Sequence, residues 1–143
     1  MEALTGQLIP GIEMKLGFTP RLRAIAGYSL AGLFALWSIY TADMFDQAAS
    51  ISGSLWFDGF LDYMNASVPH SSVRQVYLSL GDQEKKARTP KLAAVEDCTR
   101  QAAELLQTQG VPVKFELNRG GHFHEVPERI ARGINALTDY KEN

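Results

Sequence analysis

The sequence predicts an α/β fold in which four parallel strands form a sheet flanked by helices. Short apolar runs alternate with longer helical patterns along the chain, which is the order of strands and crossover helices in a parallel sheet. The residues with the clearest chemical pattern follow the ends of expected strands, where such sheets gather functional side chains. The 143 residues are 45% hydrophobic and 21% charged, and they contain no repeat or linker. We therefore expect a single domain over 1–143.

The first part of the chain predicts two helices and two strands. A helix is expected over 4–16, interrupted near Pro10, because proline is tolerated only close to a helix start. The apolar run 23–28 predicts the first strand. The segment 30–40 is apolar nearly all round, so it is expected to form a buried helix. A second strand is expected over 45–52.

The middle of the chain continues the alternation. The aromatic-rich segment 55–64 predicts a helix, and 73–80 predicts a third strand with its apolar residues on one face. A long amphipathic helix is expected from Thr89 to Gln109, because threonine is a good N-cap and the proline after it fits the first helical position. Gly110 is expected to end this helix.

The chain closes with one more strand and helix. The segment 113–117 alternates apolar and charged residues, which is typical of a strand near a sheet edge, and 127–137 predicts the last helix. The carboxyl ends of parallel strands meet at one edge of the sheet. Ser29 follows the first strand, 81–84 follows the third and 120–124 follows the fourth, so we expect these three segments to meet.

Composition and charge exclude several classes of function. A formal net charge of −2 and a pI near 5.9, without a basic stripe, argue against a nucleic-acid or anionic-membrane partner. The uncharged segment 24–42 is interrupted by Gly-Tyr-Ser at 27–29, where a strand and a helix would join, so we interpret it as buried rather than membrane-spanning. The single cysteine, Cys98, cannot form an internal disulfide, which favours a reducing, cytoplasmic compartment. No phosphate-binding glycine loop is present.

The hexapeptide Gly-Tyr-Ser-Leu-Ala-Gly at 27–32 predicts a nucleophile elbow around Ser29. Such an elbow is a sharp strand-to-helix turn that holds its serine in a strained backbone conformation, and small neighbours make it sterically possible. The turn presents the serine oxygen above the sheet, close to the free N–H groups at the helix N-terminus. A glycine-rich turn with a bystander serine is the alternative.

A serine hydroxyl needs an adjacent base, and His122 is the candidate. It follows two glycines in the loop after the last strand, from which its ring can reach Ser29. His124 is interpreted as a surface or packing residue, and His70 as structural or exposed to solvent. Histidine bases are commonly oriented by a carboxylate, for which this chain offers two candidates.

The two candidate carboxylates are Asp82 and Glu84, in the loop after the third strand. Only one of them can accept the Nδ1 proton of His122. Asp82 could instead close a turn, and Glu84 could belong to the solvated charges at 84–88. We favour Glu84, because a carboxylate three residues beyond the strand reaches further over the sheet. The resulting order serine, acid, histidine is the one associated with α/β-hydrolase sheets.

At these residues the chain resembles an esterase family of the α/β-hydrolase superfamily, the group that includes enterochelin esterases, esterase D and feruloyl esterase domains. The resemblance implies Ser29 as nucleophile, His122 as base and a carboxylate of the loop at 81–84 as third member. It also implies that Tyr28 and Trp56 line the substrate pocket, with core packing as the alternative. The matching segments are IAGYSLAG at 25–32, SISGSLW at 50–56, LSLGDQE at 78–84 and GGHF at 120–123.

Only the carboxyl-terminal half of that fold is expected, because 28 residues before Ser29 cannot hold the several strands that precede such an elbow. The Leu30 N–H remains as one oxyanion donor, while a second has no visible source. The strand 23–28, normally internal, becomes an apolar sheet edge. We expect this edge to pair with a second copy or with a separate chain that carries the missing half.

The sequence thus predicts a serine ester hydrolase that acts on a small-molecule ester through an acyl-enzyme. No metal or organic cofactor is expected. The alternative is a weak or inactive hydrolase remnant that serves as an interaction or oligomerisation module.

Overall fold

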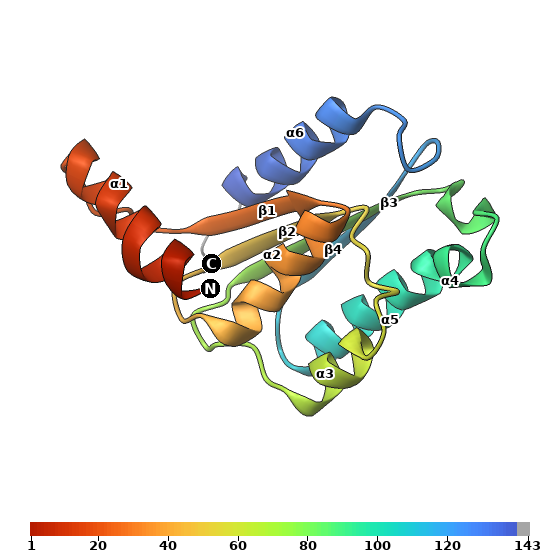
Figure 1. The fold of residues 1–143 in the computed structure, drawn as a ribbon, viewed down its shortest axis with the longest axis horizontal. Helices are drawn as coiled ribbons and strands as arrows, with labels where there is room; N and C mark the ends of the chain where they lie inside the picture. The colour runs from red at the N-terminus through yellow and green to blue at the C-terminus, as the bar shows by residue number, and fades with distance from the viewer. Residues whose placement is uncertain (140–143) are drawn as a thin grey trace.

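The computed structural model describes residues 1–139 and contains a parallel sheet with strand order β1-β2-β3-β4 (Figure 1). The strands are β1 (Ala24–Tyr28), β2 (Gln47–Ile51), β3 (Gln75–Gly81) and β4 (Val113–Asn118). Each strand pairs in parallel with the next one along the chain. The predicted α/β class and four-stranded parallel sheet are therefore confirmed. Because the strands are parallel, their carboxyl ends lie at one edge of the sheet, and the loops after β1, β3 and β4 begin there.

Helices cover both faces of the sheet (Figure 1). On one face α2 packs against β1 and β2, and α5 packs against β3 and β4. On the other face α6 crosses β1, β2 and β3. The helical elements are η1 (Ala3–Leu8, a π-helix), α1 (Ile9–Leu16), α2 (Leu30–Thr41), α3 (Phe60–Ala66), η2 (Glu84–Lys86, a 3₁₀ helix), α4 (Pro90–Ala93), α5 (Val95–Thr108) and α6 (Val126–Thr138).

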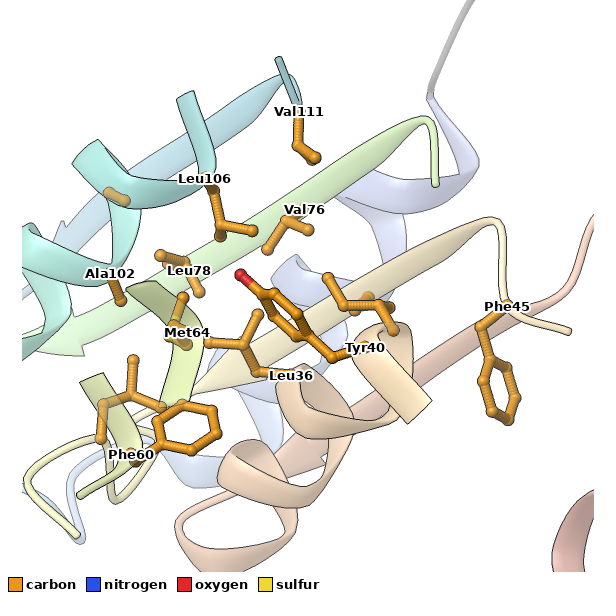
Figure 2. Packing of buried hydrophobic residues seen from close by; sticks show 14 of the residues in the cluster. Leu36, Tyr40, Phe45, Phe60, Met64, Val76, Leu78, Ala102, Leu106 and Val111 are labelled. Atoms are coloured by element: carbon orange, nitrogen blue, oxygen red, sulfur yellow. The ribbon is translucent and has the colours of Figure 1, made fainter. Parts of the chain in front are cut away.

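The larger part of the core lies between the sheet and the layer of α2, α3 and α5 (Figure 2). Its buried residues include Leu36, Ile39, Met64, Val76, Leu78 and Leu106. The Tyr40 hydroxyl reaches the edge of this cluster and donates to Gln109 Oε1 at 2.9 Å, so its polar atom is satisfied. A smaller cluster under α6 contains Ala49, Ile51, Tyr77, Ala136 and Leu137. Because helices cover both faces, all of β2 and all of β3 except Gln75 are buried.

Two predicted helices differ from the structure. Residues 55–59 form tight turns, and α3 begins only at Phe60, because Gly59 adopts a left-handed conformation (φ 77°) that cannot continue a helix. The predicted helix to Gln109 is divided at Ala94, whose ψ of −3° lies outside the helical range. The first piece, α4, packs against η2, and its Thr89 cap is confirmed by a 3.4 Å bond from the Leu92 N–H to the Thr89 hydroxyl.

The N-terminal segment forms a continuous helical rod beside the amino end of β1 (Figure 1). The expected interruption near Pro10 takes the form of a change from the π-helix η1 to α1, in which Pro10 is the second residue. The Glu13 carboxylate pairs with the Arg23 guanidinium at 2.7 Å and ties this rod to the sheet. Within the described residues, β1 pairs only with β2, so its other side is a free edge. No helix of residues 1–139 is long and apolar enough to cross a membrane.

Candidate active site

Ser29 lies at the turn between β1 and α2 with a φ of 59° and a ψ of −120°. Residues with a side chain rarely adopt positive φ, so the turn must be enforced by its surroundings. Gly27 is one requirement, because a Cβ at this position would overlap the Ala31 carbonyl. Ser29 also receives support from β2, since its N–H donates to the Ile51 carbonyl at 3.0 Å. The predicted sharp turn around Ser29 is therefore present.

His122 lies in the loop between β4 and α6, with its Nε2 3.2 Å from Ser29 Oγ. The imidazole is held between aromatic rings, with centroid distances of 5.0 Å to Tyr28 and 4.9 Å to Phe123. Gly120 has a φ of 102°, and a Cβ there would lie 2.6 Å from the His124 Cγ. The loop therefore needs glycine at this position to bring His122 over the sheet.

Glu84, rather than Asp82, meets His122. Glu84 Oε2 lies 2.7 Å from His122 Nδ1, and the Glu84 residue is only 7% exposed. Asp82 accepts hydrogen bonds from the Gly120 N–H at 2.9 Å and from the Gln83 amide at 3.0 Å. The bond to Gly120 is the main reason that the pKa of Asp82 is lowered. Asp82 thus links the two loops without touching the histidine ring.

Hydrogen bonds keep the Glu84 carboxylate ionised despite its burial. Burial opposes ionisation, but donors from His122, Ser52, Gly81 and Arg129 outweigh it and lower the pKa of Glu84 to about 2. Ser52 itself adopts a strained φ of 46° and donates its hydroxyl to Glu84 Oε1 at 2.6 Å. A buried, ionised carboxylate is therefore directed at the ring nitrogen of His122.

A cavity of about 430 Å³ opens beside Ser29 and His122. Most of its wall is apolar, and its polar lining residues are Ser29, Ser52, Ser54, Glu84 and His122. Its apolar lining residues are Leu30, Trp56, Ala87, Leu92, Val95 and Phe123. The site therefore combines a few polar side chains with an apolar wall, in a cavity large enough for part of a small organic molecule.

The remaining predicted site residues occupy different places. Trp56 lines the cavity, with the Lys91 ammonium 5.6 Å from its ring centroid. Tyr28 is not among the lining residues; its hydroxyl donates to the His122 carbonyl and its ring packs against the imidazole. Leu30 lines the cavity as the first residue of α2, so its N–H has no acceptor within that helix.

Ser52 and Arg129 are polar residues of this site that the sequence reasoning did not single out. Ser52 lies within a segment that carries the family resemblance, so that segment was the available signal. Arg129 has no signal in a single sequence, because a charged residue in an amphipathic helix is normally solvated. Within residues 1–139, no cluster of three or more His, Cys, Asp or Glu side chains is arranged to hold a metal ion.

Comparisons with known proteins identify the family and the fold of this chain. The family model described as "Putative esterase" matches residues 1–126. The chain belongs to this esterase family. It is 29% identical over 110 residues to the uncharacterized protein YbbA of Bacillus subtilis (strain 168), and the match covers 75% of this chain and 44% of YbbA.

Solved structures with a similar fold include several esterases. The siderophore hydrolase EstB from Aspergillus nidulans is 20% identical with a TM-score of 0.73, over 95% of this chain and 56% of that one. The enterobactin esterase from Shigella flexneri is 21% identical with a TM-score of 0.75, over 96% of this chain and 36% of that one. At these identities the likeness establishes the fold, a truncated form of the α/β-hydrolase sheet. The chain spans about half the length of YbbA and of EstB.

Proposed function

We propose that this chain carries the chemistry of a serine ester hydrolase, with Ser29 as nucleophile, His122 as base and Glu84 as the acid that orients it. The observation that carries the proposal is the line of contacts from Glu84 Oε2 to His122 Nδ1 (2.7 Å) and from His122 Nε2 to Ser29 Oγ (3.2 Å). Both distances are within reach of hydrogen bonding and proton transfer. Membership of the esterase family supports the same reaction class.

The proposed reaction has two halves. Ser29 Oγ attacks the ester carbonyl carbon while His122 Nε2 takes the hydroxyl proton, and collapse of the tetrahedral intermediate transfers this proton to the departing alcohol. Water then attacks the acyl-enzyme and gives its proton to His122, which releases the acid and restores the Ser29 hydroxyl. Glu84 accepts the Nδ1–H bond throughout and stabilises the imidazolium. The Leu30 N–H, at the start of α2, donates to the oxyanion.

The chamber beside Ser29 favours a small-molecule ester with an apolar group. Trp56, Leu92 and Phe123 are among its lining residues, and of the side chains in residues 1–139 only Glu84 and the ionisable His122 bring a charge to its wall. Similar structures are named as a siderophore hydrolase, an enterobactin esterase and a ferulic acid esterase. We propose that the apolar group is seated on Trp56. No cofactor takes part in this scheme.

The proposal includes a second polypeptide along β1. Losing one of two oxyanion donors slows acyl transfer by about 10²- to 10³-fold, and the Leu30 N–H is one donor. The free edge of β1 is where a second copy of this chain, or a chain with further strands, would complete the sheet. Such pairing would bring new backbone N–H groups near Ser29.

Labelling with a fluorophosphonate probe tests the proposed reaction. We expect the wild-type protein to be labelled on Ser29, as located by mass spectrometry of its peptides. Ser29→Ala and His122→Ala should abolish labelling, and Glu84→Gln should slow it by about 100-fold or more, since it removes the group that fixes the tautomer.

Two matched controls accompany this experiment. Ser54→Ala removes another serine that lines the cavity, and Asp82→Asn changes the carboxylate that does not touch His122. Both should leave Ser29 labelled, with Asp82→Asn less than about tenfold slower. Absence of labelling in the wild-type protein would favour the inactive remnant, and equal losses in Asp82→Asn and Glu84→Gln would contradict the role of Glu84.

A further inference from the structure

Arg129 is a fully buried charged residue near the start of α6, with 0% of its surface exposed. Burying a guanidinium removes it from water at a large cost unless charged and hydrogen-bonding partners replace the solvent. The reaction proposed above assigns no role to the Arg129 side chain. The burial of this charged side chain therefore needs an explanation in terms of its contacts.

The partners of Arg129 come from three loops at the carboxyl edge of the sheet. Nη2 donates to Glu84 Oε1 at 3.0 Å and to the Ser52 hydroxyl. Nη1 donates to the Gly121 carbonyl at 3.2 Å, in the loop that carries His122. One planar guanidinium thus connects the loops after β2, β3 and β4, which a shorter or more flexible cation could not do with the same geometry.

The contacts of Glu84 divide between its two oxygens. Oε1 accepts from the Gly81 N–H at 2.8 Å, from the Ser52 hydroxyl at 2.6 Å and from Arg129. Oε2 faces His122 Nδ1. Rotation of the carboxylate would break all three bonds to Oε1, so these bonds fix the direction in which Oε2 points.

We propose that Arg129 is a positioning residue, which holds the Glu84 carboxylate ionised and aimed at His122 and at the same time anchors the histidine loop through Gly121. The expected effect of Arg129 on the reactivity of Ser29 rests on the proposed function. Its effect on the ionisation and direction of the Glu84 carboxylate does not depend on any activity. Arg129 also lies outside residues 1–126, the part of the chain that the family model matches.

Within residues 1–139, two side chains that can carry a positive charge contact the Glu84 carboxylate. His122 and Arg129 form its ion pairs at 2.7 and 3.0 Å. Lys85, the next residue in η2, pairs instead with Glu96 at 3.0 Å. From β1, the Tyr28 hydroxyl lies near enough that the Glu84 charge adds to the effect of burial in raising the pKa of Tyr28. Arg129 is thus the permanent cation in direct contact with the carboxylate.

The test compares Arg129→Met and Arg129→Lys with Arg132→Met. Arg132 lies one turn further along α6, half-exposed, and bonds to Asn118 and Glu125, so it is a matched control outside the network. Two readouts need no substrate: the carboxyl ¹³C titration of Glu84, assigned with Glu84→Gln, and the downfield ¹H resonance of His122 Nδ1. The rate of fluorophosphonate labelling at pH 7 is the third.

In Arg129→Met we expect the Glu84 pKa to rise by about one unit or more, and labelling to slow by about tenfold or more. In Arg129→Lys the positive charge remains, so the Glu84 pKa should change less. Loss of the planar guanidinium with its several N–H donors should still shift the His122 Nδ1 proton resonance upfield and slow labelling. Arg132→Met should match the wild type in all three readouts.

A purely structural role predicts a different pattern. It lowers the free energy of unfolding in Arg129→Met but leaves the Glu84 titration, the Nδ1 resonance and the labelling rate at wild-type values, and that result overturns the proposal. If Arg129→Met does not fold, wild-type values in Arg129→Lys overturn it equally. If the wild-type protein is not labelled at all, the proposed function fails while the two NMR readouts still decide the positioning of Glu84.

Discussion

The turn at Ser29 depends on the absence of a side chain at Gly27. A Cβ there would overlap the Ala31 carbonyl, so Gly27→Ala must displace either β1 or the first turn of α2. We expect a loss of about 2 kcal/mol or more in the free energy of unfolding, measured by urea denaturation, and loss of Ser29 labelling. Gly11→Ala is the matched control.

The control works because Gly11 lies inside α1 with nothing within 4 Å of its would-be Cβ. Alanine should stabilise this helix by about 0.5–1 kcal/mol. Equal effects of the two substitutions would contradict the steric argument for Gly27.

Glu84 should also couple stability to pH. Its pKa is about 2 in the folded protein against a reference value of 4.5, so ionisation stabilises the fold above about pH 4.5 and this contribution is lost as pH falls toward 2. The difference between these two pKa values corresponds to about 3 kcal/mol of the free energy of unfolding. Urea denaturation between pH 6 and pH 3 should therefore show a steeper loss for the wild type than for Glu84→Gln. Parallel curves for the two proteins would argue against a depressed pKa.

The candidate site residues that the sequence located are those that stand in a recognisable local turn. Ser29 stands in a recognisable strand-to-helix turn, and His122 follows a glycine pair, so the sequence was enough to predict both as candidate site residues. The choice between Asp82 and Glu84 depended on reach over the sheet, and the structure brings Glu84 to the histidine. Arg129 could not be found, because its partners come from loops 8 to 77 residues away.

At the scale of elements, the strands could be predicted and two helices only in part. The strands are short runs that alternate with longer helical patterns; β2 and β3 are buried nearly throughout, while β4 alternates apolar and charged residues as an edge strand does. The helix predicted over 55–59 is wrong because aromatic content does not fix the backbone: these residues form turns in which Trp56 lines the cavity and Phe57 is exposed. The break at Ala94 has no marker in composition, since alanine is the best helix former.

The packing of α2 gives a prediction at this scale. Leu36 packs within the larger core cluster (Figure 2) and is 0% exposed. Leu8 in η1 is 56% exposed. Leu36→Ala should lower the free energy of unfolding by about 2–5 kcal/mol, and Leu8→Ala by about 0.5 kcal/mol or less. Urea denaturation of both variants checks this difference, and similar losses would mean that α2 is not the centre of the core.

At the scale of the whole molecule, the two edges of the sheet differ in a way that bears on assembly. The β4 edge carries Lys114 and Glu116, charges that typically prevent strands from pairing, while the whole of β1 is uncharged. Two grooves lie next to β1: the one beside α1 is mostly apolar, and the one beside α6 has both apolar and polar residues in its lining. Exposed large apolar side chains border them at Ile12, Leu16, Phe18 and Ile134. We therefore expect β1, and not β4, to pair with another strand.

This pairing can be measured by light scattering coupled to size-exclusion chromatography and by hydrogen exchange. We expect a species larger than one 15.8 kDa chain, with the β1 amides protected. Ala26→Lys places a charge on the exposed part of β1 and should shift the population toward the monomer by about tenfold or more, while Leu117→Lys on β4 should leave it unchanged. A second copy accounts for the larger species if the purified chain forms it alone; if it forms only with added cell extract, the occupant is a separate polypeptide. A wild-type monomer with unprotected β1 amides would contradict pairing at this edge, because β2 is the one strand of residues 1–139 that pairs with β1.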